Sequence, residues 1–352
     1  MTPFTYEALP ARIIFGNGTI SGLPTELSRL GRQCALILST PEQRGTAEML
    51  AGLLGTAAVG VFAGAAMHSP VNVTDEALHE VDRLRADAVV SVGGGSAIGL
   101  GKAIALRTDL PQIAVPTTYA GSEATPILGE TQEGRKTTQR SLSVLPEVVI
   151  YDVDLTLTLP SGMTATSGLN AIAHAAEALY AADANPVASM LAEQAIGLLA
   201  RSLPAIMRNS SDRAARSDAL YGAWACGTCL GLVGMSLHHK LCHVLGGSLG
   251  LPHAPTHSVV LPYAIAYNAA AAPEAMRRIA GALGSSDAAG GLHTLARSLG
   301  APLSLAELGM QVGDIDRMAD IAAANPYPNP EPLTQDGLRR LLHAVFHGRG
   351  PI

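Results

Sequence analysis

The sequence is poor in charged and aromatic side chains, and no run of like charges stands out. Charged residues make up 15% and aromatic residues 4% of the 352 residues, and the formal net charge is −6. A chain without a basic excess has no electrostatic footprint for nucleic acid or for an anionic membrane surface. The sequence therefore predicts neither partner, and an anionic ligand would have to be bound by a local pocket.

Cysteine is also scarce. Cys34, Cys226, Cys229 and Cys242 are too few to form a disulfide framework in a chain of this length. We expect no signal peptide and a reduced, cytoplasmic protein. Cys226 and Cys229 form a CxxC pair in an apolar, glycine-rich stretch without a second pair. This context favours core packing over a zinc or redox site.

One long uncharged run resembles a membrane-spanning segment in length. Residues 219–237 are long enough to raise the question of a membrane span, but they contain four glycines and are followed by His-His-Lys. These features favour a buried helix or pair of helices.

Apolar residues make up 48% of the chain, and their spacing changes along it. The first half alternates strand-like runs with helical patterns, which is typical of βαβ units and a parallel sheet. From about Leu155 onward, long Ala- and Leu-rich segments predict helices alone. The fold class is therefore an α/β nucleotide-binding domain followed by an all-α domain.

Turn residues at 159–162 (LPSG) mark the probable division, and the length suffices for two hydrophobic cores. We predict an α/β dinucleotide-binding domain over 1–157 and an all-helical substrate and catalytic domain over 158–352, with the site in the cleft between them. The expected strands are 11–15, 34–38, 59–62, 88–92, 112–115 and 148–151. The expected helices are 20–30, 42–54, 73–85, 168–181, 186–206, 212–230, 273–283 and 290–299, with a last helix beginning at Thr334 after an extended Pro-rich connector, 325–330.

The most specific local motif is VVSVGGGSAIGLGK at 89–102. An apolar strand ends in three glycines and a serine and then opens into a helix. Backbone N–H groups in such a turn can approach a pyrophosphate, and the helix N-terminus adds its positive end. We expect Gly93, Gly94, Gly95 and Ser96 to cradle a dinucleotide, although a tight strand-to-helix turn without a ligand would have the same residues.

A hydroxyl-rich turn, PTTYAGSE, follows the next expected strand. Thr117, Thr118 and Ser122 are candidates for hydrogen bonds to a ribose or to the nicotinamide amide, and Gly121 allows close backbone approach. Their alternative role is to cap the following helix.

Histidines gather in the second half of the chain. Asn170 and His174 are four residues apart, as are His239 and His243, so each pair lies on one face of a helix. His253 follows in the same histidine-rich segment. Imidazoles without an acidic partner at position 170 predict proton transfer or anion binding, because a divalent cation would lack an anionic ligand.

Six motifs occur in order along nearly the whole chain. They are GGGS at 93–96, PTTYAGSEAT at 116–125, GRKTT at 134–138, VLPEVVIYDVDLTLTLP at 144–160, SGLNAIAHAAEALY at 167–180 and HKLCHVLGGSLGLPHAPTHSVVLPY at 239–263. Together they resemble the maleylacetate reductases, a metal-independent branch of the iron-containing alcohol dehydrogenase superfamily with a dehydroquinate-synthase-like fold. The resemblance implies NAD(P)H-dependent reduction of the carbon–carbon double bond of maleylacetate to 3-oxoadipate in the degradation of aromatic compounds, and a homodimer.

The resemblance also implies roles for the histidines. In the superfamily pattern the four metal ligands fall at Asn170, His174, His239 and His253, and His243 takes part in proton relay. A neutral amide is a weak ligand, so the resemblance and the chemistry together predict that no metal is bound. We expect His243 and His239 beside the reacting carbons, and His174, His253 and Asn170 beside the dicarboxylate substrate.

Other side chains complete the expected site. Lys240 and Lys136 add positive charge for the two substrate carboxylates and for the enolate formed by hydride addition. The family pattern places Lys136 near the nicotinamide, although it could be only solvated charge. Tyr119 is a further candidate donor at the edge of the cleft, and His257 is a candidate for substrate binding or for a structural role.

The expected cofactor is NADH or NADPH. Superfamily members specific for NAD commonly have an aspartate where this chain has Ser39 and Thr40, so no carboxylate there repels a 2′-phosphate. Glu42 lies close enough to reach the ribose, so no strict preference follows. The alternatives are a metal-dependent alcohol dehydrogenase of the same superfamily, a lyase of the dehydroquinate synthase type, and a nucleotide-binding protein without catalysis.

Overall fold

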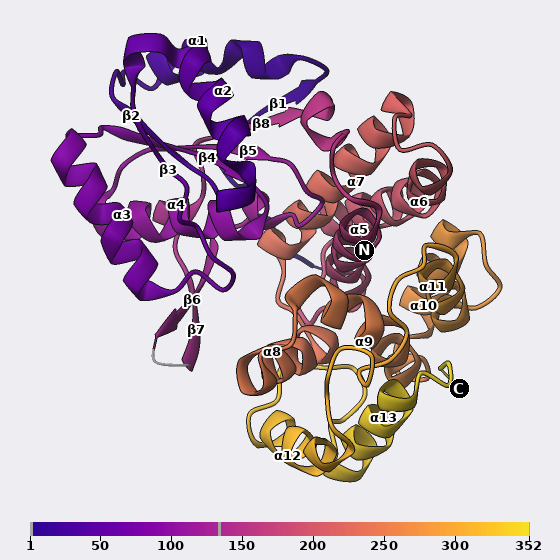
Figure 1. The fold of residues 1–352 in the computed structure, drawn as a ribbon. Coiled ribbons are helices and arrows are strands. Elements are labelled where there is room, and N and C mark those ends of the chain that lie inside the picture. Colours follow the sequence, from indigo (N-terminus) through magenta and orange to yellow (C-terminus); the bar gives the residue numbers. More distant parts are fainter. Residues whose placement is uncertain (1–2, 133–134, 352) are drawn as a thin grey trace. The chain divides into compact units, whose positions relative to one another are not determined.

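The computed structural model describes residues 3–132 and 135–351 (Figure 1). The chain divides into two compact units. Residues from Leu9 to Leu159 form the α/β unit. Residues from Pro160 onward, together with the N-terminal residues up to Ala8, form the helical unit. The division falls between Leu159 and Pro160, whereas the sequence placed it after residue 157.

The α/β unit is built on a six-stranded parallel sheet with the order β1-β8-β5-β4-β2-β3. All six expected strands are present, and each is a short, mostly apolar run. The four inner strands are buried throughout, as in a covered parallel sheet, whereas the two edge strands are mostly half-buried. The strands are β1 (Arg12–Gly16), β2 (Ala35–Leu38), β3 (Ala58–Phe62), β4 (Ala88–Gly93), β5 (Gln112–Pro116) and β8 (Val148–Asp152).

Helices cover both faces of this sheet, and Figure 1 shows α1 and α2 on one side and α3 and α4 on the other. They are α1 (Leu23–Arg29), α2 (Arg44–Leu54), α3 (Val71–Leu84) and α4 (Gly95–Thr108). Leucines of α1 and α2 pack in one core and apolar residues of α3 and α4 in the other. The sheet is therefore the middle of three layers.

The strand order has a switch point between β2 and β4. From β2 the chain continues to β3 on one side, and from β4 it continues to β5 on the other. Ligands of open parallel sheets bind outside the carboxyl ends of strands at such a point. The expected cofactor residues Ser39 and Gly93 directly follow or end these two strands, so the topology brings them to one edge of the sheet.

A second, two-stranded antiparallel sheet lies outside the main one. It consists of β6 (Ile127–Gln132) and β7 (Arg135–Arg140). The sequence indicated a hairpin-like segment here but no strands, because these residues lack the apolar runs of the main sheet.

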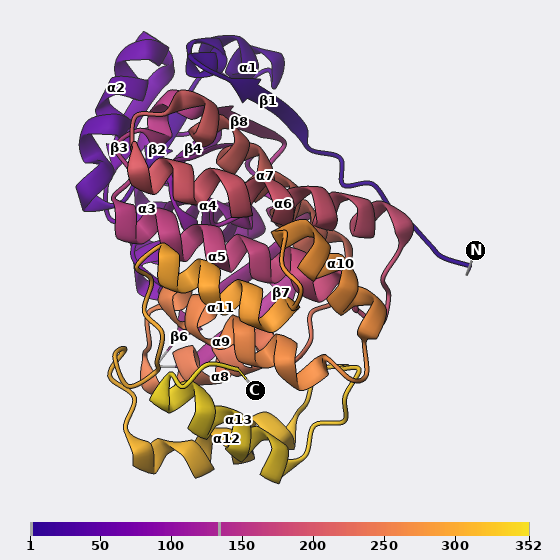
Figure 2. The ribbon, with the colours of Figure 1, turned by 90° about the vertical axis from the view of Figure 1, so that its right-hand side faces the viewer.

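The helical unit contains the other helices of the described chain, and Figure 2 shows them from the side. They are α5 (Ser161–Ala178), α6 (Pro186–Arg208), α7 (Arg213–Leu232), α8 (Leu237–Leu249), α9 (His253–Asn268), α10 (Pro273–Leu283), α11 (Ala288–Ser298), α12 (Ile315–Ala324) and α13 (Gln335–His347). The five expected helices of this half correspond to α5, α6, α7, α10 and α11. Thr334 caps the last helix, as predicted, by accepting a hydrogen bond from Gly337 N at 3.1 Å.

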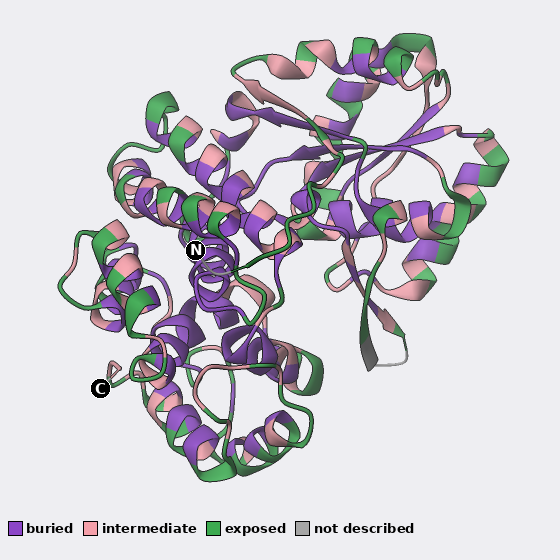
Figure 3. Ribbon diagram, turned by 180° about the vertical axis from the view of Figure 1, so that it is seen from behind, coloured by how far each residue is buried: buried purple, intermediate pink, exposed green. Residues whose placement is uncertain are grey.

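Helix α5 runs through the middle of the helical unit and is buried from Thr164 to Ala178. Figure 3 shows that buried residues concentrate in such central helices and in the strands of the sheet. Small residues allow this close packing, since a Cβ added to Gly168 would lie 2.6 Å from the side chain of Leu203. Polar side chains of α5 between Thr164 and Ala178 are therefore held away from water.

The uncharged run at 219–237 forms the end of α7 and a sharp turn into α8. Within the described residues no single helix is long and apolar enough to cross a membrane, and α7 with α8 pass that test only as a pair bent by 94°. The four cysteines are all free, and Cys226 and Cys229 are buried in α7 as predicted.

Candidate functional site

One face of α5 carries three buried polar side chains. Asn170, His174 and Glu177 are 2%, 3% and 0% exposed, and they succeed one another at spacings of four and three residues. The sequence singled out the first two residues but assigned no role to Glu177, although it lies one turn from His174.

Glu177 fastens the beginning of α8 to α5. Its Oε2 accepts a hydrogen bond from Ser236 N and its Oε1 accepts one from His238 N, both at 2.8 Å. A carboxylate at a helix N-terminus satisfies free N–H groups and interacts favourably with the helix dipole. The sharp turn before α8 and this carboxylate together set the position of His239.

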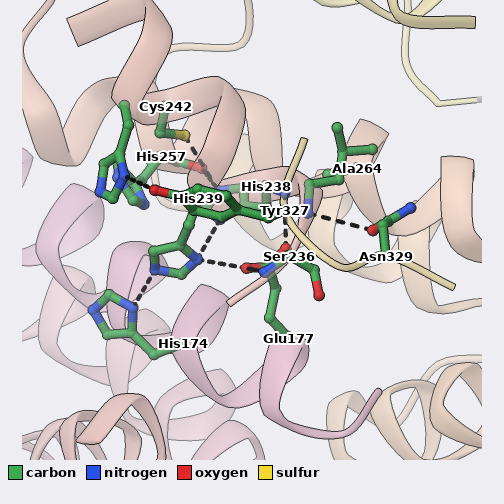
Figure 4. Close-up of polar contacts among 12 residues, drawn as sticks. His174, Glu177, Ser236, His238, His239, Cys242, His257, Ala264, Tyr327 and Asn329 are labelled. Carbon is green, nitrogen blue, oxygen red and sulfur yellow. Dashed lines mark hydrogen bonds and ion pairs between the residues drawn. The ribbon is translucent and has the colours of Figure 1, made fainter. Parts of the chain in front are cut away.

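A continuous chain of hydrogen bonds then runs back to Asn170, and Figure 4 shows its first part, from Glu177 to His174. His239 Nδ1 lies 2.7 Å from Glu177 Oε2, and His239 Nε2 lies 2.8 Å from His174 Nδ1. His174 Nε2 lies 3.4 Å from Asn170 Nδ2. We refer to these four residues as the relay chain.

The ends of the relay chain determine its direction. The amide Nδ2 of Asn170 can only donate, so His174 Nε2 accepts and His174 Nδ1–H donates to His239 Nε2. His239 Nδ1–H then donates to Glu177. An aspartate at position 170 would place an anionic oxygen against the lone pair of His174 Nε2. A neutral relay chain without a metal has a donor at this position, and the amide of Asn170 provides it.

Two further imidazoles lie against the relay chain. His238 Nε2 donates to the carbonyl oxygen of His257 at 3.0 Å, and both residues are fully buried. The ring centroid of His257 lies 4.8 Å from that of His238 and 4.2 Å from that of half-buried His253. Within the described part of the chain neither ring nitrogen of His257 has a hydrogen-bond partner, and the same holds for Asn170 Oδ1. These atoms are available to a ligand.

Burial determines the charge of these imidazoles. It lowers the pKa of His238 to about 3, assisted by repulsion from His239. Burial also lowers the pKa values of His239 and His257 well below the ordinary range, assisted by the other imidazoles. All three are therefore neutral at neutral pH, and they add no positive charge to the site.

The outer edge of the cluster is different. His243 is half-buried, and its Nδ1 lies 3.1 Å from the hydroxyl oxygen of Tyr327. Lys240 Nζ lies 5.3 Å from the centroid of the Tyr327 ring, and burial lowers the pKa of this lysine. Lys240 and His243 therefore meet at one aromatic side chain.

Tyr327 belongs to the segment 325–330, which the sequence described only as a connector. Asn329 holds this segment to α8 and α9, because its Oδ1 accepts from Leu237 N at 3.3 Å and from Asn268 Nδ2 at 3.0 Å. No sequence signal links Tyr327 to His243, since 84 residues separate them.

The superfamily ligand set does not converge on one point in this arrangement. Its members His174 and His239 hydrogen-bond to each other, and Asn170 turns its amide nitrogen toward His174. Nitrogen atoms of His238, His239 and His257 nevertheless all lie within 4.8 Å of one another, a spacing that one metal ion could share. The absence of a metal therefore stays a prediction.

In the α/β unit the expected cradle stands at the start of α4. Gly93 has a φ of 145°, which favours glycine, and a Cβ on Gly94 would lie 2.9 Å from Thr118 Cγ2. No side chain caps the helix N-terminus, and the space beside Gly95 is open. The N–H groups of Gly95 and Ser96 at this end can therefore meet an anionic ligand.

The hydroxyl-rich turn packs directly on this cradle. Thr117 N donates to Gly93 O at 3.0 Å, and the Thr117 hydroxyl donates to Gln43 Oε1 at 3.2 Å. Thr118 is 7% exposed, and the Ser122 side chain is half-buried. The turn and the glycine cradle thus form one surface at the carboxyl ends of β4 and β5.

The remaining candidates are placed as follows. Ser39 is fully buried, and within the described residues its hydroxyl has no hydrogen-bond partner. The pKa of Glu42 is lowered, first because its own backbone N–H donates to the carboxylate and second because the Thr40 hydroxyl does. Tyr119 is fully buried. Lys136 has its backbone in β7 opposite Thr131, but its side chain lies outside the described part of the structure.

Comparisons with known proteins agree with this fold. The family model "Iron-containing alcohol dehydrogenase" matches residues 10–153, and "Fe-containing alcohol dehydrogenase family, C-terminal" matches residues 164–346. A protein of Rhizobium sp. (strain MTP-10005) named maleylacetate reductase is 57% identical over 351 residues, with both chains covered completely.

Solved structures give the same result. The crystal structure of maleylacetate reductase from Agrobacterium tumefaciens is 56% identical, covers 100% of both chains and has a TM-score of 0.96. Sulfoacetaldehyde reductase from Bifidobacterium kashiwanohense, solved in complex with NAD+, is 25% identical, with 98% of this chain and 99% of that chain covered and a TM-score of 0.89. The resemblance inferred from the motifs is confirmed, and the chain belongs to the iron-containing alcohol dehydrogenase family, among the relatives named maleylacetate reductase.

Proposed function

We propose that this chain is a maleylacetate reductase, which reduces the carbon–carbon double bond of maleylacetate to give 3-oxoadipate with NADH or NADPH. Its relatives of 57% and 56% identity carry this name over the full length. The observation that carries the proposal is the relay chain, in which an amide takes the place of a metal-binding acid and closes a neutral hydrogen-bonded network.

The cofactor fits the α/β unit. Gly93, Gly94, Gly95 and Ser96 stand at the uncapped N-terminus of α4 and at the switch point of the sheet, where a pyrophosphate binds in such folds. When bound, the nicotinamide supplies a hydride. Thr117, Thr118 and Ser122 border the same surface, while Ser39 and Thr40 follow β2 at the adenosine end.

Hydride addition to the alkene carbon remote from the ketone places negative charge on the ketone oxygen, and a proton must then reach the carbon beside the ketone. His243 is the candidate that we propose for this proton, because it is half-buried at the edge of the cluster and is not a member of the relay chain. Tyr327 contacts its Nδ1 and orients the ring, so Nε2 is the nitrogen that we assign to the transfer. Lys240 stands beside the same ring and can stabilise the enolate.

Other imidazoles supply the rest of the substrate site. Among the described residues neither ring nitrogen of His257 has a hydrogen-bond partner, and its ring lies beside that of His253, so we propose that these side chains donate to a substrate carboxylate. His239 has both nitrogens engaged in the relay chain, so we assign it to orienting His174 and not to proton transfer. Lys136 keeps its proposed place near the nicotinamide, whereas Tyr119 is fully buried and is therefore no longer proposed as a donor at the edge of the site.

The test is spectrophotometric oxidation of NADH and of NADPH with freshly prepared maleylacetate in the presence of EDTA. We expect turnover with both cofactors and one cofactor oxidised per substrate consumed. Metal analysis of protein purified without chelator separates this enzyme from a metal-dependent alcohol dehydrogenase. A stoichiometric metal whose removal abolishes turnover would overturn the metal-free reaction.

The assembly is a separate part of the proposal. We propose a homodimer, supported only by the resemblance to the family. Analytical ultracentrifugation at assay concentration tests it, and a single species with the 36.1 kDa mass of one chain would exclude it.

A further inference from the structure

Lys102 is a fully buried lysine in the third turn of α4, the helix that begins with the glycine cradle. Its Nζ lies within hydrogen-bonding distance of four oxygen atoms. These are the carbonyl oxygens of Ser122 at 2.5 Å, Thr125 at 2.8 Å and Ile127 at 2.9 Å, and Thr125 Oγ1 at 3.0 Å. No part of the function proposed above uses this group.

The surroundings of Lys102 select a cation. All four oxygens act as acceptors, because the Thr125 hydroxyl gives its own hydrogen to Ser122 O at 2.9 Å. The lone pair of a neutral amine would face these oxygens, whereas an ammonium group can donate to them. Burial lowers the pKa of Lys102 to about 7, while the buried carboxyl group of Glu123 raises it. Below this pKa the side chain is thus an internal cation bound by carbonyl oxygens.

The three carbonyl groups lie in the segment 122–127, which runs from the end of the hydroxyl-rich turn to the first residue of β6. It contains a short 3-10 helix, Ser122–Ala124, and Ser122 O also accepts from Thr125 N at 3.2 Å and from the Thr125 hydroxyl. Buried carbonyls need donors, and Lys102 donates to Ser122 O, Thr125 O and Ile127 O.

The same segment extends the turn that packs on the cradle. Thr117 N donates to Gly93 O. The side chain of Thr118 packs so closely on Gly94 that a Cβ there would lie 2.9 Å from Thr118 Cγ2. Lys102 therefore connects the far end of the turn, at Ser122, to the helix whose first residues form the cradle.

We propose that Lys102 is a positioning residue for the nicotinamide dinucleotide, an internal ammonium group that holds the hydroxyl-rich turn at the correct distance from the glycine cradle. The inference rests on the proposed function, because the dinucleotide is the ligand of that turn. Removal of the ammonium group lets the segment 122–127 rearrange and moves Ser122 and Thr118 from the cofactor surface.

The first experiment measures NADH binding by nucleotide fluorescence without any substrate, for the unaltered chain and for Lys102→Met. Methionine keeps the apolar stem but donates to no carbonyl, so we expect the Kd for NADH to rise by roughly ten-fold or more. The kcat at saturating NADH should stay within about three-fold, because the reacting groups are untouched. Arg107→Met is the matched control, since Arg107 lies on the same helix, is 29% exposed and pairs with Glu130. This variant should bind NADH normally.

The second experiment is chemical rescue, which a purely structural defect would not show. Lys102→Ala leaves space for an alkylammonium ion, and n-butylammonium should restore most of the NADH affinity, whereas tetramethylammonium, which has no N–H donor, should not. If Lys102→Met does not fold, Lys102→Ala prepared in n-butylammonium carries the test.

Equal NADH affinity of Lys102→Met and the unaltered chain would overturn the proposed role of Lys102 and leave the proposed function intact. The same holds if the NADH affinity of Lys102→Ala responds equally to both ammonium ions or to neither. Failure of the unaltered chain to bind NADH would overturn the proposed function, and this inference with it.

Discussion

The buried imidazoles make the stability of the helical unit sensitive to acid. Burial lowers the pKa of His238 to about 3 and lowers those of His239 and His257 well below the ordinary value of 6.5. Below pH 6.5 the unfolded chain takes up protons on these three side chains and the folded chain does not. The free energy of unfolding must therefore fall as the pH falls.

The size of the effect follows from linkage. Each imidazole that stays neutral in the folded state loses roughly 2 kcal/mol of stabilisation between about pH 7.5 and about pH 5.0, or roughly 6 kcal/mol for the three. Glu177 opposes this trend, because burial raises its pKa and the folded chain takes up that proton first. Before this opposition, the loss from the imidazoles is comparable to the lower end of the stability of a typical domain, about 5 kcal/mol.

Urea unfolding at several pH values, in EDTA, measures this loss. Trp224, the only tryptophan of the chain, lies in α7 and reports on the helical unit alone. At about pH 5 we expect unfolding to take up roughly two to three protons, and His238→Gln to take up roughly one fewer. A free energy of unfolding that does not change between pH 7.5 and 5 would refute the reasoning, because the imidazoles would then titrate equally in both states.

Four further predictions concern the imidazole cluster and the glycine cradle. His243→Ala should lower kcat by roughly 10²-fold or more. Tyr327→Phe should lower kcat by roughly ten-fold with little change in KM, because Tyr327 acts through His243. Steady-state kinetics test both, and normal turnover of the alanine variant would mean that the proton has another source. The Asn170→Asp variant should bind a divalent metal and reduce the double bond more slowly, since the new carboxylate would face the lone pair of His174 Nε2, which lies 3.4 Å from the present amide nitrogen. Metal analysis that finds no gain in metal would exclude residue 170 as a ligand position. Gly94→Ala should raise the KM for NADH by roughly ten-fold, because its Cβ would lie 2.9 Å from the neighbouring threonine side chain; an unchanged KM would show that this turn does not approach the cofactor.

The main sheet and most helices could be predicted from the sequence because local patterns determine them. A buried parallel strand such as 88–93 is a continuous apolar run between turn residues, and α10 begins at a proline and ends before a glycine. The strands β6 and β7 could not be predicted, because their pairing depends on each other and not on a buried apolar face.

The site could be predicted only in part, for the same reason. The pairs Asn170 with His174 and His239 with His243 follow from helical spacing, and the structure brings the first pair and His239 into one chain of hydrogen bonds. Glu177 lies on the same face of α5 as Asn170 and His174, but in the sequence alone it cannot be told from a surface glutamate. Its role follows only from the turn before α8, which brings free N–H groups to its carboxylate.

The segment held by Asn329 has a consequence for biosynthesis. Tyr327 and Asn329 are added to the growing polypeptide long after α5 and α8, yet they complete the contacts around His243 and the start of α8. A nascent chain that still lacks these residues has neither the contact of Tyr327 with His243 nor that of Asn329 with Leu237. Both contacts can therefore form only after residues 327–329 have been synthesised.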